Sequence, residues 1–164
     1  MIKKINLFLI KTNRPFFLIL IVVFGILLNV SISLLVYYFL ETSFGEENET
    51  ALFSSKILEY ILVVFIAPLT ETAIFQYLLI VFILKNFSYK NKQIQITFLM
   101  IISSLLFALI HLYSFYYFIM AFIMGVYFGY ITLLSEFFRE KKINVFISVF
   151  LTHSMINLVA MIFD

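Results

Sequence analysis

Residues 16–40 read FFLILIVVFGILLNVSISLLVYYFL and contain no charged side chain. A helix of about 20 apolar residues crosses the hydrocarbon core of a bilayer, so this stretch is long enough to span a membrane. The whole chain of 164 residues shares this character, since 64% of its residues are hydrophobic and only 12% are charged. Such a composition lies far from that of a soluble domain. The sequence therefore predicts an all-α, polytopic transmembrane helical bundle.

The apolar stretches predict about five spans, separated by short polar segments. The predicted spans cover roughly residues 16–40, 54–84, 94–113, 115–135 and 143–162. The second stretch has about 30 residues, which is too short for two crossings. We therefore expect it to form one long helix that is kinked near Pro68.

Basic residues gather on one side of this predicted topology. They precede the first span, follow the second and follow the fourth, and they are Lys3, Lys4, Lys11, Arg14, Lys85, Lys90, Lys92, Arg139, Lys141 and Lys142. The positive-inside rule assigns this side to the cytoplasm. We therefore expect a cytoplasmic N-terminus and a C-terminus outside. The Ile, Phe, Lys and Asn bias favours a bacterial source, and hence an integral protein of the bacterial cytoplasmic membrane.

The chain divides into two predicted parts. Residues 1–45 form an N-terminal cytoplasmic tail and a transmembrane anchor of generic sequence, and residues 46–164 form the membrane core. On the fourth span, Gly125 and Gly129 make a Gly-x-x-x-Gly pattern, which predicts close helix packing. This packing can occur within or between subunits, so the oligomeric state stays open. The lipid bilayer is the expected environment, and nothing in the sequence indicates a nucleic-acid partner.

Four polar residues in the apolar segments are the candidate catalytic residues: Glu71, His111, His153 and Asn157. A polar side chain at membrane depth is costly unless it is paired or used. His153 and Asn157 are four residues apart, so both side chains project from the same helix face. These residues predict a polar site inside the bundle.

Several other chemistries are excluded by the residues present. The chain has no cysteine, so it has no thiol nucleophile. Its only aspartate is Asp164, which rules out a dyad of two aspartates. Neither histidine is followed by glutamate, so there is no His-Glu-x-x-His zinc helix.

Three ordered motifs carry a family resemblance. Residues 67–76 (APLTETAIFQ), then Phe107-x-x-x-His111, then His153-x-x-x-Asn157 resemble the motifs of the CPBP intramembrane proteases. This family includes the CAAX prenyl endopeptidases of the Ras-converting type and the bacterial Abi proteins. The first motif of the family usually reads Glu-Glu-x-x-x-Arg, whereas this chain has Thr72 and Gln76 in place of the second Glu and the Arg. Losing both charges together leaves neither one orphaned.

The resemblance implies an intramembrane endopeptidase that acts on membrane-associated proteins or peptides. From the residues present, we expect it to need no cofactor. In this hypothesis Glu71 is the general base for a water held jointly with His111, and His153 and Asn157 stabilise the oxyanion. Zinc bound by Glu71 and the two histidines is an alternative, but it leaves no obvious second carboxylate as base. The alternative function is a non-catalytic membrane scaffold or immunity-type protein that has kept the protease fold.

Overall fold

The computed structural model describes residues 11–40, 55–87, 90–138 and 143–163, and the regular elements within these ranges are all helical. Five helices are long and apolar enough to cross a membrane: Arg14–Leu35, Lys56–Asn86, Lys92–Leu109, Phe115–Glu136 and Val145–Phe163. This confirms the predicted all-α fold and the prediction of about five spans. The third helix ends at Leu109 instead of near residue 113, so the predicted boundary was wrong there.

The long second helix is continuous but changes its winding along its length. Its segments are α3 (Lys56–Ile61), η1 (Leu62–Ile66), α4 (Ala67–Glu71), η2 (Thr72–Phe82) and α5 (Ile83–Asn86), of which the two η segments are π-helical. The other helices are α2 (Arg14–Leu40), α6 (Lys92–Leu109), α7 (Phe115–Leu133, continuing as the π-helical η3, Leu134–Phe138) and α8 (Val145–Phe163). The prediction of one long helix is confirmed.

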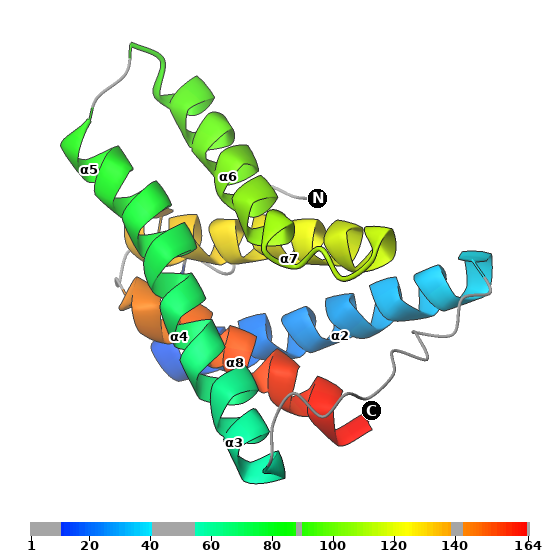
Figure 1. Ribbon diagram of the computed structural model, residues 1–164. Coiled ribbons are helices and arrows are strands. Elements are labelled where there is room, and N and C mark those ends of the chain that lie inside the picture. The colour runs from blue at the N-terminus through cyan, green and yellow to red at the C-terminus, as the bar shows by residue number, and fades with distance from the viewer. Residues whose placement is uncertain (1–10, 41–54, 88–89, 139–142, 164) are drawn as a thin grey trace.

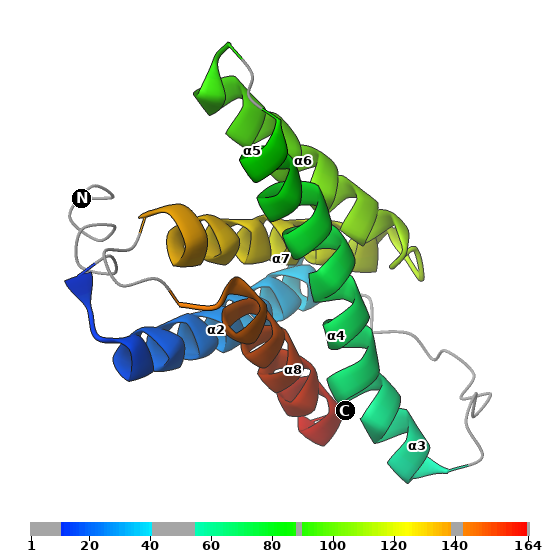
Figure 2. The same cartoon turned by 90° about the vertical axis from the view of Figure 1, so that its left-hand side faces the viewer.

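The long helix crosses the bundle and contacts different partners along its length (Figure 1). Its first part, η1 and α4, packs against α8, and η2 packs against α6, α7 and α8. Helix α7 lies in the middle of the bundle and contacts α2, α6, α8 and η2 (Figure 2). It is the most buried of the five spans. Helix α2 packs on α7 and α8, so it is an integral part of the bundle.

The glycine pair of α7 explains how closely this helix approaches α6. A Cβ atom on Gly125 would lie 2.9 Å from the Cα atom of Ser104 on α6, which is too close for any side chain. The same atom on Gly129 would meet its nearest neighbour, Cδ1 of Ile80, at an ordinary 3.5 Å. The predicted packing role is therefore confirmed within the chain, and Gly125 carries most of it.

The long helix continues past Pro68, and a π-helical turn comes just before this residue. The backbone N–H of Ala67 donates to the carbonyl of Leu62, five residues earlier. In the same register the carbonyl of Val63 would pair with Pro68, which has no N–H. The carbonyl of Val63 is thus left free to accept a hydrogen bond from another helix.

Candidate active site

Glu71 is the point at which three segments of the chain meet. It is the last residue of α4, and its side chain is 13% exposed. Its Oε1 atom lies 3.8 Å from Nε2 of His111, and its Oε2 atom lies 3.6 Å from Nε2 of His153. The three ionisable residues singled out from the sequence are therefore neighbours, although they come from the long helix, the end of α6 and α8.

The spacing between Glu71 and the two histidines suits a small polar molecule. Both distances are longer than a direct hydrogen bond between nitrogen and oxygen, which measures about 2.7–3.2 Å. A single water molecule can bridge polar groups at such separations. The Oε2 atom of Glu71 is also buried without a hydrogen-bond partner in the described part of the chain, so it can still accept a bond.

His111 is held by the end of its own helix. It lies in the turn after Leu109, and its Nδ1 atom is 2.7 Å from the carbonyl oxygen of Phe107. A carbonyl only accepts, so Nδ1 carries the proton, and in the neutral ring Nε2 is an acceptor directed toward Glu71. Burial lowers the pKa of His111, opposed by a smaller effect of the bond to Phe107, so this ring favours the neutral form.

His153 is enclosed by aromatic rings. Its side chain is 7% exposed, and the ring centroid of Phe128 lies 4.7 Å away, with that of Phe107 at 5.7 Å. Its Nδ1 atom is buried without a hydrogen-bond partner among the described residues. The sequence analysis did not single out these two aromatic residues as a support for the histidine ring.

Asn157 is fixed by the carbonyl that Pro68 leaves free. Its Nδ2 atom donates to the carbonyl oxygen of Val63 at 2.9 Å, which ties α8 to the long helix. An amide nitrogen has two hydrogens, so one N–H and the Oδ1 atom of Asn157 are left for another partner. Asn157 therefore joins two helices and also lines the cavity described next.

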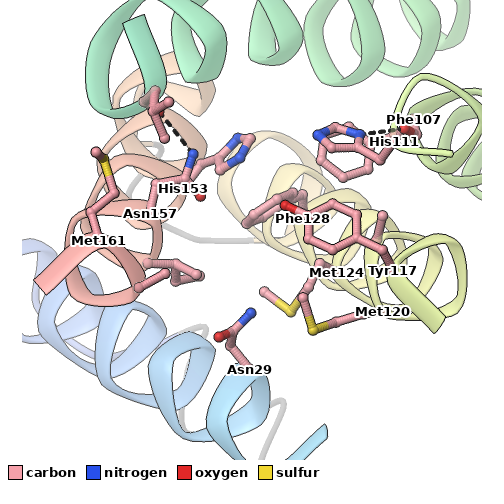
Figure 3. Close-up of a pocket in the computed structure, with 14 residues that line it drawn as sticks. Asn29, Phe107, His111, Tyr117, Met120, Met124, Phe128, His153, Asn157 and Met161 are labelled. Atoms are coloured by element: carbon pink, nitrogen blue, oxygen red, sulfur yellow. Dashed lines mark hydrogen bonds between the residues drawn. The ribbon is translucent and has the colours of Figure 1, made fainter. Parts of the chain in front are cut away.

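A cavity of about 170 Å³ opens beside the histidines (Figure 3). It is lined by His111, His153 and Asn157 together with residues of α2, the long helix, α6, α7 and α8. At about 30 Å³ per water molecule, it has room for several waters or for a short piece of a peptide. Glu71 is not part of this lining and lies beside the cavity, next to the two histidines.

One cavity residue, Asn29, comes from the first span and was missed by the sequence analysis. It is the only amide side chain between residues 16 and 40. An amide inside a lipid-spanning helix is costly unless it has a partner, and this was the signal that could have identified it.

The two residues that replace the usual charges lie in the interior. Thr72 is 0% exposed and Gln76 is 1% exposed. The Oγ1 atom of Thr72 and the Nε2 atom of Gln76 have no hydrogen-bond partner in the described residues. Both positions are therefore sites where an unpaired charge would be costly.

The described residues contain no set of three His, Cys, Asp or Glu side chains arranged so that they could hold a metal ion. Glu71 and the two histidines make a three-membered group, in which the carboxylate oxygens of Glu71 lie 3.8 Å and 3.6 Å from the Nε2 atoms of His111 and His153.

A comparison with known protein families gives a match over the part of the chain that contains these residues. A family model described as type II CAAX prenyl endopeptidase, Rce1-like, matches residues 53–159, which is well over half of the chain. The match contains Glu71, His111, His153 and Asn157, whereas α2 lies before it. No curated protein and no solved structure matches the chain.

Proposed function

The chain belongs to the Rce1-like family of type II CAAX prenyl endopeptidases, and from this premise we propose that it is an intramembrane endopeptidase with Glu71 as its general base. The family and the five membrane-spanning helices indicate a protease of membrane-associated proteins or peptides. The observation that carries the proposal is the position of the Glu71 carboxylate between the Nε2 atoms of both histidines.

In the proposed reaction, a water molecule donates one hydrogen bond to Glu71 and one to Nε2 of His111. Glu71 takes a proton from this water as its oxygen attacks the peptide carbonyl, which forms a tetrahedral intermediate. The proton then passes from Glu71 to the leaving amide nitrogen as the C–N bond breaks. The products are a carboxylic acid and an amine, and Glu71 returns to its starting charge.

The developing oxyanion needs donors on the opposite side of the carbonyl carbon. We assign this role to Nε2–H of His153 and to the N–H of Asn157 that is not bonded to Val63. Preorganised donors stabilise such a charge strongly where water is excluded. The support for this assignment is that both side chains line the cavity from α8, and that Asn157 is held in place by its other N–H.

We favour a reaction without a metal because the residues that line the cavity offer no second carboxylate to act as a base. If Glu71 were a zinc ligand, another group would have to act as base, and the residues lining the cavity include no carboxylate. We therefore assign Glu71 to proton transfer. Exhaustive chelation of the purified protein is expected to leave its cleavage rate unchanged, and zinc found in stoichiometric amount together with loss of activity would favour the metal reaction.

The proposal is tested by comparing newly formed peptide termini in membranes from cells that express the wild type or Glu71→Gln at equal abundance. Termini that appear only with the wild type identify substrates, which are then cleaved by purified protein. General-base catalysis contributes about 10²–10⁴-fold, so Glu71→Gln is expected to lower the cleavage rate by that factor.

Glu59→Gln is the matched control, because Glu59 lies on the same long helix twelve residues earlier. It is expected to cleave as the wild type does. If Glu71→Gln retains full cleavage, Glu71 is not the base. Identical termini with all three proteins and an unchanged cellular phenotype would favour the non-catalytic scaffold.

A further inference from the structure

We propose that Asn29 of α2 is a substrate-binding residue whose amide hydrogen-bonds to the main chain of a peptide lying in the cavity. This inference rests on the proposed function and extends it to a helix that lies outside the family match. With Asn29 in this role, helix α2 forms one side of the substrate-binding site and also anchors the chain in the membrane.

The face of α2 that contains Asn29 is held tightly against the bundle. Ile21, Gly25 and Asn29 are each four residues apart, so they follow one another along one face of the helix. The hydroxyl of Tyr127 on α7 donates to the carbonyl of Ile21. A Cβ atom on Gly25 would lie 2.9 Å from Cδ1 of Ile156 on α8 and 2.9 Å from Cε1 of Tyr127. The close approach at Gly25 thus brings the next turn, with Asn29, to the cavity.

Asn29 has no partner, among the residues that the structure describes, to account for its presence. Its side chain projects from α2 toward the cavity, near Met120 and Met124 of α7 (Figure 3). It makes no hydrogen bond with any residue that the structure describes. Because an unpaired amide at membrane depth is costly, a ligand that hydrogen-bonds to it would recover that cost.

The chemistry of the cavity indicates a peptide with apolar side chains. An asparagine amide offers a donor and an acceptor, and so can pair with both the C=O and the N–H of a main chain of any sequence. Met120, Met124 and Met161 also line the cavity. Methionine side chains are flexible and polarizable, so they adapt to apolar groups of different shape. Asn29 would then fix the main chain, while the methionines accept different side chains.

The first test measures KM and kcat for purified wild type and Asn29→Ala with a substrate identified through its new termini. Loss of one hydrogen bond that is equally strong in the ground and transition states raises KM and leaves kcat unchanged. We expect KM to rise by about 3- to 10-fold, with kcat within twofold. Ser31→Ala is the control, because the Ser31 hydroxyl bonds only to its own helix at Leu27. An unchanged KM for Asn29→Ala, or an equal rise with Ser31→Ala, would overturn the proposal.

The second test does not depend on cleavage. The chain has no cysteine, so Asn29→Cys and Leu27→Cys each introduce a single thiol, with Leu27 59% exposed on the outer side of the bundle. In proteoliposomes, a charged maleimide is expected to label Asn29→Cys but not Leu27→Cys. The capped peptide acetyl-Leu-Phe-Leu-Phe-amide at millimolar concentration is expected to slow this labelling severalfold.

The two tests separate the two proposals. If the wild type cleaves nothing but the peptide protects Asn29→Cys, the cavity binds peptides and only the proposed catalysis fails. If cleavage is normal but the peptide gives no protection, or if both thiols are labelled equally, Asn29 does not contact the substrate.

Discussion

Glu71 and Thr72 are neighbours in the sequence, yet they lie in two chemically different layers of the bundle. Glu71 lies beside a cavity and faces two histidines, and its side chain is 13% exposed. Thr72 is 0% exposed and, with Gln76 one turn later, belongs to an interior layer of neutral polar side chains. The chain thus keeps an ionisable group where water can reach it and uses uncharged groups where the helices only pack.

Charging the interior layer is expected to have the largest effect on stability. Thr72→Glu would place a carboxylate where the Oγ1 atom of Thr72 has no hydrogen-bond partner among the described residues. An unpaired buried charge costs about 3–5 kcal/mol. The double variant Thr72→Glu with Gln76→Arg supplies a partner one turn away and is expected to recover most of this loss. Thermal unfolding in detergent micelles measures both variants.

These two variants test whether the interior layer tolerates charge only in pairs. Thr72→Gln is the control, because it adds bulk and polarity without charge. The interior layer would not differ from the cavity layer in its tolerance of charge if Thr72→Glu and Thr72→Gln had equal unfolding midpoints. The same would follow if the double variant recovered no stability.

In the cavity layer, substitution is expected to affect activity more than folding. His153→Leu removes a proposed oxyanion donor, which lowers kcat by about 10²–10³-fold. The leucine would lie against the rings of Phe107 and Phe128 and would remove a buried Nδ1 atom that has no partner in the described ranges. The unfolding midpoint is therefore expected to stay at or above that of the wild type. If activity and folding decrease together, His153 has a structural role only.

The spans and the ionisable residues were predictable because their signals are local. Each span is an apolar run, and Glu71, His111 and His153 stand out against such runs because their side chains are polar and ionisable. The end of the third helix was not predicted, since residues 110–113 continue the apolar run beyond Leu109. Ser114, whose hydroxyl caps the next helix by accepting from the N–H of Tyr117, was the available signal.

Features that depend on which faces of two helices meet were not predictable. The bond from Asn157 to Val63 forms where the π-helical register before Pro68 leaves the carbonyl of Val63 without a backbone partner, and no sequence pattern specifies this register. The amide of Asn29 marks this residue as unusual in its span, but its position at the cavity depends on the approach of α2 at Gly25, which hydropathy does not encode. The apolar pattern locates a span along the chain but does not orient it about its axis.

The two glycines of α7 offer a smaller test of packing apart from charge. Gly125→Ala would push a methyl group against the backbone of Ser104, and overpacking of this kind costs about 1–3 kcal/mol. Gly129→Ala is the matched control, because its Cβ would make only ordinary contacts. We expect a clear fall in the unfolding midpoint for the first variant and little change for the second. Equal midpoints would show that α7 can shift away from α6.

The smallest effect is expected where a charge pair lies at the surface. Nζ of Lys85, near the end of the long helix, lies 2.6 Å from Oε1 of Glu136 in η3, and the side chains are 48% and 14% exposed. Because Lys85 is half in solvent, the pair is worth at most about 1 kcal/mol. Glu136→Gln is expected to lower the unfolding midpoint slightly at low salt and less at high salt, since salt screens exposed charges. If Glu136→Gln lowers the unfolding midpoint as much as Thr72→Glu does, this end of the bundle tolerates an unpaired charge no better than the interior around Thr72. Solvent exposure would then not explain where the chain has its charged residues.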